Sequence, residues 1–392
     1  MIDLTRKRLA RLLPVPRAIL LLIVGGYFLL LWTVGGWSQW NDLGVPSLPF
    51  PYGDLRSVTS AWECTRRGIA VMAANPCDPY HRSANFPGIW LAPSHLGLGV
   101  GDTVWLGSCL AVIFAVAVFA VLPASSRPLD AVVYGAAACS PAVMLGVERG
   151  NVDILLFAFV VLAVILYRRS DRLPWGHALI LFAAILKLFP IFAAGVLARQ
   201  RSRRNLIALG VVLAAFAIYC VAIIGELKTL WRVTPRPPEY EFAYGVRVFS
   251  QWIGSSHLAF WDVDVIGLVL VAMVVACSRL RLRLEDGNPA ARRDLDLFVA
   301  GAGVYVLSYA LFLNYEYRLA FLLLTVPQLL RWAHERRLLG AIPLTALLAT
   351  LWFDLRPWAN VFGFHSPVAL VASSQLILFA GLIGGLIAAA RA

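Results

Sequence analysis

The stretch that decides the fold runs from Trp175 to Ala198 and reads WGHALILFAAILKLFPIFAAGVLA. It is apolar enough to enter a bilayer, but Lys187 and Pro190 stand near its middle. Proline lacks a backbone N–H and clashes with the preceding turn, so a helix breaks there. Arginine clusters flank both ends, and a single crossing would place one cluster on the wrong side of the membrane. We therefore predict two half-helices over 175–198, with both ends in the cytoplasm.

The rest of the chain is equally apolar. Of its 392 residues, 60% are hydrophobic and 14% are charged, whereas soluble domains have about 45–50% apolar and about 25% charged residues. Long unbroken apolar runs, rather than short alternating segments, exclude a membrane β-barrel. The formal net charge is +12, yet no soluble basic segment is interleaved with aromatic residues, so nucleic acid is not an expected partner. The composition predicts an all-α polytopic membrane protein, and we expect it in the plasma (inner) membrane.

Ten further apolar segments are candidate spans, since about 20 residues cross a bilayer. They are 18–37, 103–122, 129–147, 152–167, 205–224, 263–279, 296–313, 317–331, 338–354 and 368–389. We predict about ten full spans plus the broken re-entrant pair, in a single transmembrane domain over 1–392 with both termini in the cytoplasm. This topology gives the cytoplasmic segments a net charge of +14 and the outside segments −3. An excess of Lys and Arg in the cytoplasmic loops is what sets the orientation of a membrane protein.

The longest outside loop is 38–102, and the second large one is 225–262. Asp54 stands in the first loop within Pro51-Tyr-Gly-Asp-Leu-Arg56. A lone loop aspartate is usually solvated, but one at the membrane surface can also act as a general base; Asp42 and Asp78 compete for that role. Cys64 and Cys77 share this loop on the oxidising side of the membrane. They could form a disulfide or stay as two free thiols, and the sequence does not decide between these alternatives.

The stretch from Asn75 to Trp90 is dense in turn formers and aromatic residues. Asn-Pro and Asp-Pro initiate turns, and Trp and Tyr favour the membrane interface. Interfacial anchoring is therefore one interpretation. The other is that its polar side chains, Tyr80, His81 and Asn85, bind a substrate.

A second polar cluster, from Glu148 to Asp153, lies between two apolar segments. Charges in such a place are costly unless they are paired or functional. In one interpretation an ion pair closes the hairpin and Asn151 is a helix N-cap. In the other, Arg149 binds an anionic headgroup, assisted by Asn151 and the following helix N-terminus. Asp153 is a further substrate-binding candidate.

Lys187 is the one Lys or Arg deep within an apolar stretch, and such a cation predicts a binding site. Phosphate is its natural partner. A third cluster, Asn314-Tyr-Glu-Tyr-Arg318, offers Glu316 as a substrate contact and Arg318 as a weaker phosphate ligand, unless the two simply pair. No His/Cys cluster has metal-ligand spacing, so we expect neither a metal nor a cofactor.

In their order along the chain, these motifs resemble glycosyltransferase family 87, the polyprenol-phosphate-mannose-dependent mannosyltransferases of the GT-C superfamily. The resemblance covers roughly residues 15–335. The motifs are Gly-Asp-Leu in the first outside loop, Asn-Pro-x-Asp-Pro-Tyr, Asn-Phe-Pro, Arg-Gly-Asn-Val-Asp and Leu-Lys-Leu-Phe-Pro. Lys187–Pro190 fits the Lys-x-Tyr/Phe-Pro of the family. Arg149-Gly-Asn-Val departs from it, since the family often has Gly-Gln-x-Asn there.

The resemblance implies that Asp54 is the catalytic base of an inverting sugar transfer on the outer membrane face, with a polyprenyl-phosphate sugar, by family default mannose, as donor. Lys187, with Arg149 and Arg318, would stabilise the departing phosphate. The short outside loops favour a lipid or lipid-linked glycan as acceptor. The surrounding membrane lipids are the other expected partners. Two other classes stay open: a lipid or polysaccharide transporter or flippase, and a glycan ligase or polymerase.

Overall fold

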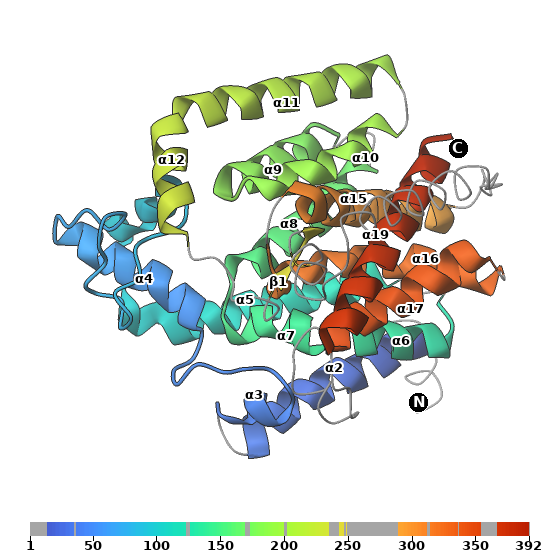
Figure 1. Ribbon diagram of the computed structural model, residues 1–392, viewed down its shortest axis with the longest axis horizontal. Coiled ribbons are helices and arrows are strands. Elements are labelled where there is room, and N and C mark those ends of the chain that lie inside the picture. Colours follow the sequence, from blue (N-terminus) through green and yellow to red (C-terminus); the bar gives the residue numbers. More distant parts are fainter. Residues whose placement is uncertain are drawn as a thin grey trace, which may run out of the picture.

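The structure is a computed structural model, and it describes residues 14–34, 37–122, 126–168, 173–199, 202–234, 243–246, 248, 289–311, 314–335, 337–353 and 367–391. Helices make up most of these residues (Figure 1). In chain order they are α2 (Val15–Val34), α3 (Gln39–Asp42), α4 (Gly53–Arg66), η1 (Gly88–Leu96), η2 (Val100–Asp102), α5 (Thr103–Val121), α6 (Pro128–Ala138), α7 (Pro141–Glu148), α8 (Val152–Tyr167), α9 (Leu173–Leu186), η4 (Phe189–Ala194), α10 (Gly195–Ala198), α11 (Arg203–Ala222), α12 (Ile224–Val233), α15 (Pro289–Leu311), η5 (Glu316–Leu324), α16 (Val326–His334), α17 (Leu338–Phe353) and α19 (Pro367–Arg391).

Two short strands pair antiparallel, β1 (Ala243–Tyr244) and β2 (Asn314–Tyr315). Ala243 lies opposite Tyr315, and Tyr244 lies opposite Asn314. This pairing ties part of the second large loop to the start of η5. Helix α12 covers the start of that loop, whereas its residues 235–242, 247 and 249–262 and the predicted span 263–279 lie outside the described residues.

The predicted all-α membrane class is confirmed. Within the described ranges, four helices are long and apolar enough to cross a membrane: Val100–Val121, α11, α15 and Leu370–Ala390. A fifth results if α6 and α7, which are bent by 54° at Pro141, form one span. Shorter apolar helices occupy the predicted segments near 18–37, 152–167 and 338–354. The full number of ten spans and the cytoplasmic position of the termini stay predictions.

The outward surfaces of α5 and α11 are apolar. Val112, Val116, Val211 and Ile218 are each more than 60% exposed. A soluble monomer rarely exposes contiguous apolar surface of this extent, whereas lipid covers it in a membrane protein. These helices therefore form the lipid-facing side of the bundle.

The break predicted within 175–198 is present. Helix α9 ends at Leu186, two non-helical residues follow, and the chain resumes as η4. In an uninterrupted helix the N–H of residue 190 would donate to the carbonyl of Leu186, but Pro190 has no N–H. The indole Nε1 of Trp90 donates to that carbonyl instead, at 2.8 Å. The hydroxyl of Tyr219 donates to the neighbouring Ile185 carbonyl at 3.0 Å.

The first large loop builds a small apolar core of its own. Its buried residues include Leu55, Val58, Trp62, Val71 and Phe86. A disulfide joins Cys64, near the end of α4, to Cys77 in the following turn, which resolves the alternative that the sequence left open. The loop is therefore a folded unit in which α4 packs against η1, and Trp90 of η1 connects it to the broken helix.

Replacing both disulfide cysteines by alanine is expected to lower the free energy of unfolding by about 3 kcal/mol. The reason is that the segment between the two cysteines then has a higher conformational entropy in the unfolded chain. Thermal unfolding in detergent measures the loss. The matched control replaces Cys109 and Cys220, which are free thiols, and should leave the unfolding temperature unchanged. Alkylation of Cys64 and Cys77 in the unreduced wild-type protein would contradict the assignment.

Trp90→Phe removes the replacement donor and leaves the Leu186 carbonyl without its hydrogen bond, at a cost of about 1–3 kcal/mol. Amide hydrogen exchange over 183–194 should become faster. Trp105→Phe is the control, because the exposed Trp105 indole donates only to Asp102. Equal exchange in both variants would show that Trp90 does not hold the break.

Candidate functional site

The turn between α7 and α8 packs directly onto the start of α4. Gly150 has a φ of +58°, and a Cβ there would lie 2.9 Å from the Cβ of Tyr52 and 3.1 Å from that of Leu55. Only glycine combines this backbone conformation with so close an approach. The Arg149 carbonyl accepts hydrogen bonds from the backbone N–H groups of Asp54 (2.9 Å) and Leu55 (3.2 Å). It thereby satisfies donors that the first turn of a helix leaves free and places Asp54 beside the start of α8.

Asn151 links Asp54 to α8 through both ends of its amide. Its Oδ1 accepts from the backbone N–H of Asp153 at 3.0 Å, as an N-cap does. Its Nδ2 donates to Oδ2 of Asp54 at 2.7 Å. Because the cap fixes which end of the amide is the acceptor, the other end must present N–H groups to the carboxylate. The predicted N-cap is confirmed, and the side chain of Asp54 remains 29% exposed.

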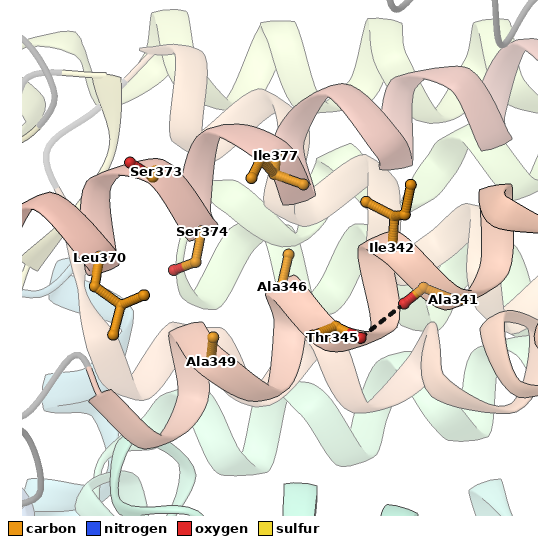
Figure 2. Close-up of a pocket in the computed structure, with 9 residues that line it drawn as sticks. All are labelled: Ala341, Ile342, Thr345, Ala346, Ala349, Leu370, Ser373, Ser374 and Ile377. Atoms are coloured by element: carbon orange, nitrogen blue, oxygen red, sulfur yellow. Dashed lines mark hydrogen bonds between the residues drawn. The ribbon is translucent and has the colours of Figure 1, made fainter. Parts of the chain in front are cut away.

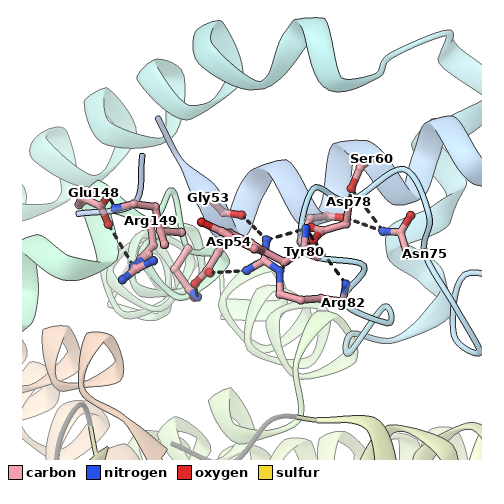
Figure 3. A network of polar contacts seen from close by, with 12 residues as sticks. Gly53, Asp54, Ser60, Asn75, Asp78, Tyr80, Arg82, Glu148 and Arg149 are labelled. Atoms are coloured by element: carbon pink, nitrogen blue, oxygen red, sulfur yellow. Dashed lines mark hydrogen bonds and ion pairs between the residues drawn. The ribbon is translucent and has the colours of Figure 1, made fainter. Parts of the chain in front are cut away.

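Arg82 is a residue of this site that the sequence did not reveal. Its Nη1 lies 3.6 Å from Oδ1 of Asp54, and its Nη2 donates to the Gly53 carbonyl (2.8 Å) and to Oδ2 of Asp78 (2.9 Å), as Figure 3 shows. Burial raises the pKa of Asp78, but the hydrogen bonds and charge of Arg82 outweigh it and hold that pKa below its ordinary value. The available signal was the spacing of four between Asp78 and Arg82.

Asp153, in the first turn of α8, pairs with two cationic side chains. Its side chain is fully buried, and it receives Lys187 Nζ on Oδ1 at 2.5 Å and Arg318 Nε on Oδ2 at 3.4 Å. The Lys187 side chain keeps 28% of its surface exposed. Arg318 lies over the ring of Phe189 at 4.0 Å, a favourable cation–π geometry. Arg318 therefore reaches Asp153 and also Asn314, while Glu316 is buried at the start of η5.

One continuous set of contacts thus joins the two residues that the sequence singled out. It runs from Asp54 through the cap residue Asn151 to Asp153, and from there to Lys187. A carboxylate and an ammonium group, both partly exposed, therefore lie at the start of one helix.

Arg149 has a different environment. Its Nε lies 3.1 Å from Oε2 of the buried Glu148, and its Nη2 donates to the Pro46 carbonyl. Oε1 of Glu148 also accepts from the Trp37 indole (3.1 Å) and the Leu48 backbone (2.9 Å). Glu148 and Arg149 therefore form the ion pair that one of the two interpretations of this cluster expected.

The remaining candidates lie at the edge of the site. Tyr80 is 48% exposed and packs against Phe50 with ring centres 5.5 Å apart. Arg82 lies over its ring. His81 and Asn85 are exposed. Tyr80 is therefore linked to Asp54 through Arg82.

A pocket of about 390 Å³ lies elsewhere, between α17 and α19 (Figure 2). Its lining consists of alanine and aliphatic side chains with the hydroxyl groups of Thr345, Ser373 and Ser374, and it contains none of the candidate site residues. This lining has no acidic, basic or thiol side chain that could serve as a general base or bind a phosphate, so the polar site at the start of α8 is the stronger candidate.

Comparison with known proteins gives one match. The sequence model of glycosyltransferase family 87 matches residues 87–308, which is more than half of the chain. The matched region contains Asn151, Asp153 and Lys187, and it begins after Asp54. No curated protein and no solved structure matches the chain.

Asp153→Asn is expected to destabilise the protein by about 3–5 kcal/mol, because it leaves two cations at a buried site without their carboxylate. Thermal unfolding in detergent would measure this. Glu63→Gln breaks a surface pair with Arg67 and should cost at most about 1 kcal/mol. Equal losses in the two variants would contradict the proposed importance of the buried charges.

Proposed function

The chain belongs to glycosyltransferase family 87 and is therefore a membrane glycosyltransferase. We propose a specific reaction for it. The protein transfers a hexose, mannose by the default of the family, from a polyprenyl-phosphate donor to a lipid or lipid-linked glycan. The reaction takes place on the extracytoplasmic face of the plasma membrane. The observation that carries the proposal is the set of contacts from Asp54 through Asn151 and Asp153 to Lys187, because it brings a base and a phosphate-binding cation together.

Asp54 is the proposed base. Asn151 holds one of its oxygens, and its partial exposure leaves room for an acceptor hydroxyl. Asp54 takes the proton of that hydroxyl, the hydroxyl oxygen bonds to the anomeric carbon, and the bond from that carbon to the phosphate oxygen breaks. The electron pair leaves with the polyprenyl phosphate. Attack from the side opposite the phosphate inverts the anomeric centre.

Lys187 and Arg318 are the proposed ligands of the donor phosphate. An ammonium group has three donors and a guanidinium has five, so both can bind phosphate oxygens while they remain on Asp153. Asp153 neutralises one of the two positive charges and fixes their position. The pair then stabilises the charge that develops as the phosphate leaves, which is the usual role of preorganised cations at such a site.

We assign the phosphate to these two residues rather than to Arg149, whose guanidinium is held by Glu148 and Pro46. Asn151 and Arg82 position Asp54. Tyr80, His81, Asn85 and Glu316 remain candidates for contacts with the sugar or the acceptor. A flippase would move its substrate without covalent change, and a ligase or polymerase would use a lipid pyrophosphate donor, so the identity of the product separates the three functions.

Asp54→Asn should lower sugar transfer at least 100-fold, the low end of what a general base contributes, with the unfolding temperature preserved. The assay supplies a panel of polyprenyl-phosphate sugars in membranes and detects the new glycolipid. Asp42→Asn is the matched control, an exposed aspartate of the same loop, and should retain activity. Full activity of Asp54→Asn would refute the base assignment, and transport of unmodified lipid would favour the flippase.

A further inference from the structure

One cation close to Asp54 has no protein partner. Arg56 follows Asp54 by two positions in α4, a rise of about 3 Å along the helix, and it is partly buried. Within the described residues its guanidinium donates no hydrogen bond and forms no ion pair, and its Nε is buried without an acceptor. Because a buried donor without a partner is costly, an acceptor from outside the chain would stabilise this side chain.

The other three arginines of the first large loop are engaged. Arg66 donates to a backbone carbonyl, Arg67 pairs with a glutamate, and Arg82 pairs with two aspartates. All of residues 38–102 are described, so the contrast covers the whole loop. Arg56 is the arginine of this loop whose charge the described protein does not compensate.

The ring of Phe50 orients Arg56. The guanidinium lies over this ring, 4.8 Å from the ring centre, a cation–π contact that uses no hydrogen-bond acceptor. Gly53 allows Phe50 this position, since a Cβ there would lie 3.3 Å from Cε2 of Phe50. The guanidinium is therefore positioned beside the start of α4 by apolar contact, and its N–H donors remain for a ligand.

Ring contacts link Arg56 to Oδ1 of Asp54. That oxygen lies 3.6 Å from Nη1 of Arg82, and the Arg82 guanidinium lies 5.4 Å from the ring centre of Tyr80 (Figure 3). The Tyr80 and Phe50 rings lie 5.5 Å apart, centre to centre. Two guanidinium groups therefore flank an aromatic pair next to the proposed base, and one of them is free.

The other oxygen of Asp54 leads to the donor site. Oδ2 accepts from Asn151, and from there the contacts run to Asp153 and Lys187. Arg56 is thus connected to the base by a different route from the cations assigned to the donor phosphate. In an inverting transfer the acceptor approaches opposite the departing phosphate, so a free cation on this second route suits the acceptor.

We propose that Arg56 binds a phosphate in the headgroup of the acceptor lipid, while the acceptor hydroxyl lies at Asp54. The assignment rests on the proposed function, and it narrows the acceptor to a phosphate-bearing lipid. A planar guanidinium binds two phosphate oxygens at once through charge-assisted hydrogen bonds. Arg56 thereby determines specificity for the acceptor and takes no part in breaking the bond to the donor.

The test measures binding without turnover, by native mass spectrometry of the purified full chain in detergent. One probe is a mannosyl glycerol joined to its lipid by a phosphodiester, and the other is mannosyl diacylglycerol, which has the same sugar and no phosphate. Arg56→Gln should bind the phosphodiester lipid roughly tenfold more weakly, as expected for a lost hydrogen bond between charged groups, and the neutral lipid like the wild type. Equal losses for the two lipids would overturn the proposal.

Arg67→Gln is the matched control, because it removes the same charge from an exposed position directly after α4. It should bind both lipids like the wild type, and a loss equal to that of Arg56→Gln would indicate diffuse attraction to positive charge. Polyprenyl phosphate should bind Arg56→Gln and the wild type equally, and weaker binding to the variant would assign Arg56 to the donor. Displacement of the phosphodiester lipid by equal concentrations of inorganic phosphate would refute a headgroup site.

A turnover assay separates this proposal from the proposed function. Arg56→Gln should raise the KM for the phosphodiester acceptor far more than it lowers kcat, with the KM for the donor unchanged. If the wild type transfers sugar to neither lipid, the proposed function fails, whereas the difference in binding still decides the role of Arg56. Should Arg56→Gln not fold, Arg56→Lys replaces it, because lysine keeps the charge and loses the planar fork; wild-type affinity of that variant would contradict bidentate binding.

Discussion

Close packing of the Arg149–Asn151 turn against the start of α4 is the contact on which the rest of the site depends. Gly150 allows it, because its positive φ and missing Cβ let Tyr52 and Leu55 approach. The Arg149 carbonyl then caps α4, and Asn151 reaches Asp54. The same short turn thereby fixes a residue of the first loop against a transmembrane helix. Without it, the Asp54 carboxylate would lie in a loop with no defined relation to the cations below.

The broken helix supplies the second half of the site for a related reason. Pro190 ends α9, which leaves Lys187 outside regular helix and leaves two backbone carbonyls without helical partners. Trp90 and Tyr219 satisfy these carbonyls, while Asp153 receives the ammonium group. Trp90 belongs to the first loop, so the loop that carries Asp54 also stabilises the break that presents Lys187. The two halves of the site are therefore held by the same unit, which the Cys64–Cys77 disulfide closes.

Charges are distributed along the bundle in two layers with different partners. At the Asp54 end, three buried carboxylates, Asp78, Glu148 and Asp153, each hold an arginine or lysine. At the other end, Asp294 pairs with Arg331 and Asp296 pairs with Arg199. The first arrangement suits the positioning of reacting groups, and the second joins α15 to α16 and to the end of α10 through ion pairs.

Much of this could be predicted from the sequence, because apolar runs, the bias of Lys and Arg and the Lys187–Pro190 break are local features that act on the chain wherever it folds. They predicted the all-α membrane class, the break and the helix start at Asn151, and they singled out Lys187, while the family resemblance singled out Asp54. Tertiary structure alone decided the partners. Arg82 reaches Asp54 from 28 positions along the chain, Trp90 reaches Leu186 from 96 positions away, and Arg149 pairs with Glu148 rather than projecting toward the cations on Asp153. Such pairings depend on how helices pack and on which buried groups lack a partner, and no local pattern of residues contains that information.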